Sequence, residues 1–322
     1  MDISIIIPVY NSQNYLERCL DSVIRALKYY KKTGEILMVD NNSTDNSLEI
    51  IKSYQKKYPK IIRILKCKVQ GAAATRNYGT SNAKGKYIWY VDADDEITEE
   101  SIKELLDVAL ETQADLVMLG IKRVYPDHHS DYLSAVCPNQ VNYKSRFVRY
   151  GMGPMQLLIR KKWWDENGFK FREGIIHEDM ELMSALILYT DKYAAVDKPL
   201  YFYYQNEGSV LHKKQWDPHY FDIFVALDGL YDRFKKAGAE KAYRDELEWF
   251  FIWNLLIDSA KDFQKFPEGK SGFYQSREML KKYFPNWRKN RFLKEKPLKL
   301  RARVLFNYFL TLTKDGANNK GC

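Results

Sequence analysis

Gly85-Lys86-Tyr87-Ile88-Trp89-Tyr90-Val91-Asp92-Ala93-Asp94-Asp95 is the stretch that decides the fold. Its apolar and aromatic run, Tyr87 to Val91, predicts a strand that is buried on both faces. Three carboxylates follow that run within four residues, at Asp92, Asp94 and Asp95. Because ligands of an open parallel sheet bind beyond the carboxyl ends of its strands, we expect these acids at a binding edge.

The acidic cluster has two interpretations. Three close carboxylates repel one another unless a cation or hydrogen bonds offset the repulsion, and their hard oxygen atoms suit Mg²⁺ or Mn²⁺. Alternatively, the run from Asp95 to Glu100 leads into a helical pattern, where acids serve as N-caps. An EF-hand is excluded, because Ile97 stands at the loop position that needs Gly and Lys103 at the one that needs Glu.

Strand and helix patterns alternate through the first 120 residues. We predict strands near residues 3–7, 35–39, 61–65, 87–91 and 116–119, separated by helices that include residues 72–82 and 101–110. This alternation is typical of a doubly wound α/β sheet.

The usual phosphate cradles are missing from this α/β pattern. No GxGxxG motif follows the first strand, and the sequence contains no GxxxxGK[ST] motif. Two residues remain at the predicted strand ends: Tyr10, which can stack on a base, and Asp40, which can accept from a base N–H. Arg76, in the predicted helix 72–82, can pair with phosphate. Together with the acidic cluster these residues suit a nucleoside diphosphate; taken singly, Tyr10 is equally a packed aromatic and Arg76 a solvated helix residue.

These motifs in order resemble those of family 2 glycosyltransferases with the GT-A fold. The matching stretches are Ile5-Ile6-Ile7-Pro8-Val9-Tyr10-Asn11, Val39-Asp40-Asn41-Asn42-Ser43-Thr44-Asp45, Gly71 with Arg76-Asn77-Tyr78-Gly79, Val91-Asp92-Ala93-Asp94-Asp95, and Gly174-Ile175-Ile176-His177-Glu178-Asp179-Met180-Glu181-Leu182. The resemblance covers about the first 210 residues. It implies a Rossmann-like, mostly parallel sheet flanked by helices and an inverting transfer of a sugar from a nucleotide sugar, expected to be a UDP-sugar, to a glycan or lipid-linked acceptor.

The resemblance also assigns roles to residues. Nucleotide-sugar contacts are expected from Pro8, Val9, Tyr10, Asn11, Asp40, Arg76, Asp92 and Ala93. Asp94, with Asp92 and Asp95, is expected to hold Mn²⁺ or Mg²⁺, and His212 is a further candidate for the metal or the diphosphate. Asp179 is expected to deprotonate the acceptor hydroxyl, with Glu178 holding its position, although the two acids by themselves also suit an exposed helix start.

Aromatic residues suggest where an acceptor sugar binds. Trp163 and Trp164 are candidates for the floor of that pocket because sugar rings stack on aromatic faces, and burial in the core is the alternative.

The sequence departs from the family pattern at two places. The second motif usually reads Asp-Asp-Gly-Ser, whereas here it reads Asp40-Asn41-Asn42-Ser43, which puts a second acid there in doubt. In the third motif, the family commonly has an asparagine two residues before the glycine, and here Val69 stands at that position before Gly71. The QxxRW motif and multiple membrane spans of the family's processive synthases are not found, so we expect transfer of one sugar per encounter.

The last third of the chain has a different character. We predict a catalytic domain at residues 1–215, with a donor half (1–120) and an acceptor half (121–215), and a helical basic extension at residues 216–322. Between Lys281 and Arg303 stand ten Lys or Arg and one acid, a net charge of +9 that equals that of the whole 322-residue chain. Interleaved with Phe284, Trp287, Phe292 and Leu293, this segment suits an anionic membrane surface, and a solvated helical face is the alternative.

Composition bounds the remaining possibilities. The four cysteines show no close pairing, no signal peptide is recognised at Met1, and no apolar run reaches 18 residues, so we expect a cytoplasmic protein associated peripherally with the inner face of the membrane. A non-catalytic nucleotide-sugar or glycan-binding module on a decayed fold is the alternative function. Nucleic-acid binding is not expected, because the excess charge lies outside the predicted site.

Overall fold

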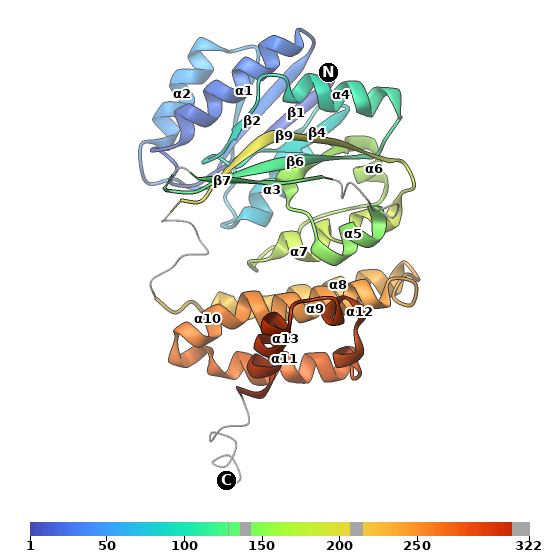
Figure 1. Cartoon of the computed structure of the whole chain (residues 1–322). Helices are drawn as coiled ribbons and strands as arrows, with labels where there is room; N and C mark the ends of the chain where they lie inside the picture. The colour runs from blue at the N-terminus through green and yellow to red at the C-terminus, as the bar shows by residue number, and fades with distance from the viewer. Residues whose placement is uncertain (128, 136–142, 207–214, 311–322) are drawn as a thin grey trace. The chain divides into compact units, whose positions relative to one another are not determined.

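The structure is a computed structural model that describes residues 1–127, 129–135, 143–206 and 215–310. In the described residues, one sheet of nine strands runs in the order β3-β2-β1-β4-β8-β6-β9-β5, and β7 pairs with β6 (Figure 1). The strands are β1 (Ile3–Val9), β2 (Gly34–Asp40), β3 (Ile62–Lys66), β4 (Tyr87–Tyr90), β5 (Glu96–Ile97), β6 (Leu116–Val124), β7 (Ser130–Leu133), β8 (Leu157–Arg160) and β9 (Tyr193–Tyr204).

The first four strands, β1 to β4, are joined by parallel pairing. β1 pairs in parallel with β2 and with β4, and β2 pairs in parallel with β3. The antiparallel strand β8 then joins β4 to β6, which runs parallel to β9. The carboxyl ends of β1 to β4 therefore meet at one edge, as the alternating pattern predicts.

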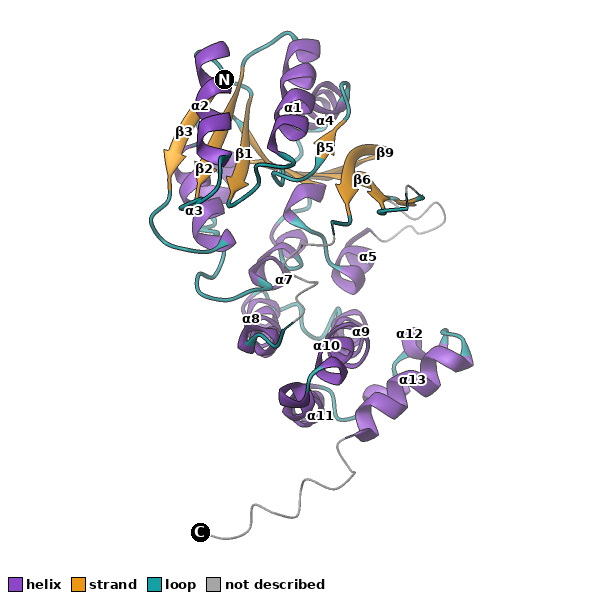
Figure 2. Cartoon of the chain, turned by 90° about the vertical axis from the view of Figure 1, so that its left-hand side faces the viewer, coloured by secondary structure: helices purple, strands orange, loops and turns teal. Residues whose placement is uncertain are grey.

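The two faces of β1 bury different helices. Ile5 and Ile7 join the core that includes Leu20 of α1, whereas Ile6 faces α3 on the other side, where Gly79 lies so close that a Cβ there would stand 2.5 Å from the Ile6 side chain. The helices of this part of the chain are α1 (Leu16–Tyr30), α2 (Ser47–Lys57), α3 (Ala72–Asn82), α4 (Ser101–Glu111) and α6 (Lys161–Glu166). Figure 2 shows the strands from the side with helices on both faces of the sheet.

The sequence pattern does not predict two strands of the sheet, β8 and β9. β9 spans twelve residues, but Asp197, Lys198 and Pro199 interrupt its apolar run, and its register to β6 shifts at Gly120. β8 is only four residues long. Both strands are held in the sheet by partners distant in sequence, so local periodicity does not reveal them.

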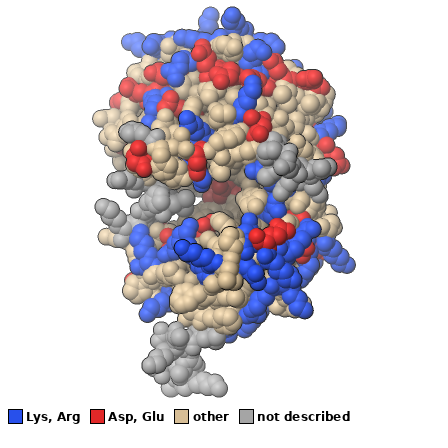
Figure 3. All heavy atoms as spheres, viewed as in Figure 1, with Lys and Arg blue, Asp and Glu red and all other residues tan. Residues whose placement is uncertain are grey.

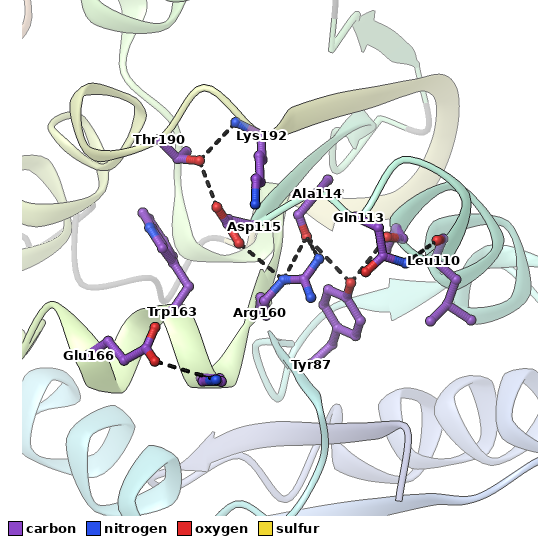
Figure 4. A network of polar contacts seen from close by, with 12 residues as sticks. Tyr87, Leu110, Gln113, Ala114, Asp115, Arg160, Trp163, Glu166, Thr190 and Lys192 are labelled. Atoms are coloured by element: carbon purple, nitrogen blue, oxygen red, sulfur yellow. Dashed lines mark hydrogen bonds and ion pairs between the residues drawn. The ribbon is translucent and has the colours of Figure 1, made fainter.

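A polar network ties the strands together at the edge opposite the acidic cluster (Figure 4). The Arg160 guanidinium donates to the Ala114 carbonyl and pairs with Asp115 at 3.0 Å, while the Tyr87 hydroxyl also donates to Ala114. Thr190 donates to the other oxygen of Asp115 at 2.7 Å. These contacts anchor the beginnings of β4 and β6 and the segment before β9, so they are structural.

The described residues divide into two compact units. The sheet unit contains those of Met1–Tyr143, Met152–Gly174 and Tyr189–Ser209, and the helical unit contains the remainder. Besides short 3₁₀ turns, the helical unit holds α5 (Tyr143–Tyr150, from its second residue), α7 (Glu178–Met183), α8 (Asp222–Lys236), α9 (Arg244–Trp253), a π-helical turn (Asn254–Asp258), α10 (Ser259–Lys265), α11 (Lys270–Tyr283), α12 (Arg291–Lys294) and α13 (Leu298–Phe309). Residues 144–151 and 175–188 thus belong by packing to the helical unit, and the domain boundary at residue 215 stays a prediction.

The helical unit has an aromatic core. Phe284, Trp287, Phe292 and Leu293, which the sequence analysis assigned to a membrane-facing segment, are all buried in it. Phe284, for example, packs edge-on against Phe251 with ring centroids 5.0 Å apart. In the described part of the chain, no helix combines the length and the apolar character needed to cross a bilayer.

Candidate functional site

The carboxyl ends of the parallel strands bring together residues from separate motifs. Val9 at the end of β1 is in register with Asp40 at the end of β2, and Ile6 is in register with Tyr90 of β4. Tyr10, the next residue after β1, is 54% exposed, so its ring is open to a ligand. Asp40 is buried and accepts a hydrogen bond from the Ser43 amide through Oδ1.

The turn after β2 is held by asparagine side chains. Asn41 donates to the carbonyls of Cys67 and Val69, and its Oδ1 accepts from the Gly71 amide at 2.8 Å. Asn42 has a φ of 62°, the left-handed conformation that asparagine tolerates better than most residues and that the family's usual glycine adopts freely. Asn41 and Asn42, the two residues that differ from the usual second motif, therefore preserve the turn. Asn41 also connects the turn to the loop before α3.

The first acid of the cluster is paired with the arginine of α3. Arg76 Nη2 lies 3.1 Å from Asp92 Oδ1, and its guanidinium carbon lies 5.8 Å from the centre of the Phe171 ring. Phe171 is held by a reciprocal pair of hydrogen bonds between its backbone and the Asn77 side chain, each 2.9 Å long. A cation and an anion thus stand side by side at the edge, which suits a ligand that carries phosphates.

The third acid is a structural anchor. Asp95 Oδ2 accepts from the Tyr201 hydroxyl at 2.6 Å, and Oδ1 accepts from the Tyr204 amide at 2.8 Å. The Tyr201 hydroxyl also accepts from the Asp92 amide at 3.1 Å. Burial, followed by repulsion from Asp92 and Asp94, holds the pKa of Asp95 well above its usual value.

The helix-cap interpretation of this cluster is wrong. Residues Glu96–Ile97 pair with β9 as strand β5, and α4 begins only at Ser101. Its N-cap residue, Glu100, makes no side-chain capping hydrogen bond. The carboxylate of Asp95 instead joins the turn after β4 to the end of β9.

Arg18 of α1 supports the same turn from another side. Its Nη2 donates to the Asp94 carbonyl at 2.6 Å, and its Nε lies 3.2 Å from Glu96. The guanidinium stacks over the ring of Tyr204 at 3.7 Å, and the Tyr204 hydroxyl donates to Glu96. A planar, charged group held on three sides fixes the backbone of the turn.

Asp94, the second acid of the cluster, is partly buried. Its Oδ2 accepts from Asn206 at 3.0 Å. Burial, followed by the neighbouring charge of Asp92, raises the pKa of Asp94, so its ionised form lacks full compensation. A cation beside this carboxylate would supply that compensation.

The carboxylates fit a divalent ion that is shared with a ligand. In the described residues, no group of three or more His, Cys, Asp or Glu side chains is arranged to enclose a metal. Both oxygens of Asp95 are engaged, which leaves Asp92 and Asp94. Mg²⁺ in phosphate-binding sites is commonly held by one or two carboxylates and completed by phosphates and water, so this pair suits such an ion.

The second acidic motif begins α7 in the helical unit. Glu178 is buried, whereas Asp179 is half-buried and its Oδ1 accepts from the Met180 amide. His177 precedes them with a φ of 68°. Burial lowers the pKa of His177, although the negative charge of Asp179 raises it in part. His177 therefore favours its neutral form.

The other predicted site residues lie as follows. Asn11 Oδ1 accepts from the Thr44 amide at 2.8 Å, Pro8 lies in β1, and Val9 and Ala93 are buried. Trp163 and Trp164 of α6 are also buried, and they pack against Phe169 with ring centroids 5.0 and 5.6 Å apart. This packing corresponds to the core alternative, and an acceptor role for them stays a prediction. His212 lies outside the described residues.

Sequence patterns do not reveal three residues of this site: Arg18, Tyr201 and Asn206. Arg18 stands in an ordinary amphipathic helix, and Tyr201 stands in β9, whose apolar run is interrupted. Their roles depend on contacts across the sheet, so no local pattern signals them.

Comparison with known proteins identifies the family. Residues 4–164 match the model of glycosyl transferase family 2, a region that runs from within β1 into α6 and includes every residue of the acidic cluster. The chain belongs to glycosyl transferase family 2. The resemblance inferred from the motifs is thereby confirmed.

Two relatives of this family 2 protein are named for the synthesis or modification of phosphate-containing polymers. It is 28% identical to a poly(ribitol-phosphate) beta-glucosyltransferase of Bacillus spizizenii, over 78% of this chain and 40% of that protein. It is 35% identical to the minor teichoic acid biosynthesis protein GgaA of Bacillus subtilis, over 81% of this chain and 61% of that one. The chain thus spans less than two thirds of either relative.

A solved structure shows the fold of this family 2 protein. The crystal structure of S. aureus TarS 1–349 in complex with UDP-GlcNAc matches 97% of this chain and 91% of that chain, with a TM-score of 0.75 and 20% identity. The predicted GT-A α/β fold with C-terminal helices is confirmed.

Proposed function

We propose that this family 2 glycosyltransferase transfers one sugar from a UDP-sugar to a hydroxyl group of a wall polymer or another cell-surface glycan. The observation that carries the proposal is the edge at which separate motifs meet: exposed Tyr10, Asp40, the Arg76–Asp92 pair and Asp94. The names of the two wall-polymer relatives and the UDP-GlcNAc bound to TarS support the choice of donor and acceptor class.

In the donor site, each residue contributes one kind of contact. Tyr10 stacks on the base, Asp40 accepts from a base N–H, and Arg76 neutralises phosphate charge. Arg76 is already paired with Asp92, so a diphosphate competes for a guanidinium that the protein has oriented. Phe171, over which that guanidinium lies, limits its movement.

Asp94 and Asp92 would hold Mn²⁺ or Mg²⁺ together with the diphosphate. The ion, when bound, stabilises the negative charge that develops on the leaving UDP. Tyr201, Asp95 and Arg18 keep the two carboxylates in position by fixing the turn that carries them.

On the acceptor side, Asp179 serves as general base. The acceptor oxygen forms a bond to the anomeric carbon while the bond from that carbon to the diphosphate breaks, and the proton of the hydroxyl passes to Asp179. This single displacement inverts the anomeric configuration. A positioned base of this kind contributes roughly 10²–10⁴-fold in rate.

We propose the cytoplasmic face of the membrane as the place of action, because a lipid-linked or membrane-anchored acceptor is presented there. The missing QxxRW motif supports transfer of one sugar per encounter rather than processive synthesis.

Calorimetry and thermal-shift titrations with UDP, GDP, CMP and several UDP-sugars, each with and without Mn²⁺, test the donor site. We expect metal-dependent binding that is confined to uridine nucleotides. If no nucleotide binds with any metal, the enzymatic function is refuted, and a glycan-binding module on the same fold becomes the better explanation.

A further inference from the structure

Helix α13 (Leu298–Phe309) has two apolar faces, of which only one is packed. On the packed face, Val304, Asn307 and Tyr308 are buried. The Asn307 side chain donates to the Leu256 carbonyl at 2.7 Å, and the Tyr308 and Trp287 ring centroids lie 5.0 Å apart. The helix is therefore firmly docked on the helical unit by one side.

The opposite face of α13 is an exposed apolar stripe. Leu298 is 77% exposed, Phe306 62%, Phe309 44% and Leu305 38%. Leu298, Ala302, Leu305 and Phe309 follow one another at spacings of four, three and four residues, which places them along one line of a helix. Phe306, the residue after Leu305, lies beside this line and widens the apolar surface. We call this surface the α13 stripe.

Basic residues border the α13 stripe on both sides. Since successive helical residues are about 100° apart, Lys299 and Arg303 lie on one side of the stripe and Arg301 on the other. The guanidinium of Arg288 lies 5.5 Å from the Phe309 ring, and 4.6 Å from the Tyr308 ring, on the side of Arg301. No Asp or Glu occurs in α13. Figure 3 shows Lys and Arg side chains gathered over the helical unit on the face drawn.

This arrangement is complementary to a lipid headgroup region. An apolar strip between two rows of cations lets the apolar side chains reach the acyl boundary while the basic side chains meet lipid phosphates. At about 1.5 Å per residue a helix of this length is roughly 18 Å long, which is too short to cross an acyl layer of about 30 Å. The helix can therefore lie in the plane of a bilayer surface but cannot span it.

A second copy of the chain fits the α13 stripe less well. A two-fold contact between two such stripes would bring like-charged borders face to face. The stripe also offers five apolar side chains, whereas a stable protein interface uses about 20–30 residues a side.

We propose that α13 is a membrane-interface helix that binds anionic bilayers through the α13 stripe and its basic borders. This assignment replaces the buried aromatics of residues 284–293 as the lipid-contacting side chains. It does not rest on the proposed function, because it concerns lipid alone and requires neither donor nor acceptor.

The test is co-flotation of the protein with vesicles of phosphatidylcholine alone or mixed with phosphatidylglycerol. We expect binding only to the anionic vesicles. Binding should decline as the salt concentration rises from about 50 to about 500 mM, because salt screens the attraction between the basic side chains and the lipid phosphates. Phe306→Glu should lower the partition coefficient at least about ten-fold, and Phe306→Leu should retain most of it. Lys299→Glu combined with Arg303→Glu should abolish the preference for anionic vesicles.

Tyr274→Glu is the matched control, because Tyr274 is 57% exposed on α11 of the same unit and lies outside the stripe. It should bind vesicles like the wild type, and circular dichroism should show all variants folded. Absence of binding at low salt, or equal loss in Tyr274→Glu and Phe306→Glu, would overturn the proposal. So would self-association that Phe306→Glu disrupts in a protein that does not bind vesicles.

Discussion

The hydroxyl of Tyr201 donates a 2.6 Å hydrogen bond to Asp95 and accepts one of 3.1 Å from the amide of Asp92. One buried phenol thus joins β9 to both ends of the acidic turn. Its own pKa is raised well above the usual value by burial and by the charges of Asp95 and Asp92, so it remains a donor across the physiological range.

Removal of this hydroxyl should damage both stability and donor binding. Tyr201→Phe leaves the ring in place but deprives Asp95 of a donor and the Asp92 amide of its acceptor, at a cost of about 1–3 kcal/mol in the free energy of unfolding. Denaturation in urea and calorimetry with UDP measure the two effects. Tyr87→Phe is the control: it removes a buried hydroxyl that donates to Ala114 at the opposite edge, so it should lower stability without changing UDP affinity.

Asp94→Asn should stabilise the protein and impair its activity. Because the folded-state pKa of Asp94 is raised by burial and by Asp92, its ionisation disfavours folding above the usual carboxyl pKa. The stability advantage of the variant should be largest near neutral pH and shrink as pH falls through the raised pKa. Thermal melts between pH 4 and 8 measure this trend, and a variant less stable than the wild type at pH 7 would contradict it.

The same variant tests the metal ligand. We expect the Mn²⁺-dependent part of UDP-sugar binding to disappear and turnover to fall by about 10²-fold or more, since charge stabilisation by a metal is worth several kcal/mol. Titration of Mn²⁺ in the presence of UDP gives a readout that is independent of turnover.

Arg18→Lys should weaken donor binding despite the retained charge. Lysine cannot stack on Tyr204 at 3.7 Å while reaching both the Asp94 carbonyl and Glu96, so the turn loses its rigid support. We expect the KM for the UDP-sugar to rise by about ten-fold, equivalent to roughly 1.4 kcal/mol. Arg25→Lys, on the exposed side of the same helix, should behave as the wild type; equal effects in both variants would argue against a role of the turn.

Asp179→Asn should separate binding from transfer. The affinities for UDP and UDP-sugar should stay within about two-fold of those of the wild type. Release of UDP in the presence of acceptor should fall by about 10²–10⁴-fold. Glu278→Gln, an exposed carboxylate of the same unit that pairs with Lys281, is the control. Near-normal turnover of Asp179→Asn would refute the general-base role.

Local sequence determined much of this protein. Short apolar runs and helical patterns predicted β1 to β4, α3 and the parallel edge, and α3 has the predicted bounds, 72–82. Motif order also led to the family, because a strand that ends in acids and a turn rich in asparagine are encoded within a few residues. Each of these features depends on residues that are close together in the chain, so it can be predicted without knowledge of the fold.

Tertiary structure alone decided which side chains are engaged and which are available. Asp95 and Asp94 are adjacent and chemically identical, yet the first is saturated by Tyr201 and Tyr204 of β9, a strand hidden by Pro199 and its charged neighbours. In the helical unit, Trp287 is buried whereas Phe306 is exposed, although each stands within three residues of an arginine. Long-range packing distributes burial and hydrogen bonds among residues of the same type, and no local pattern contains that information.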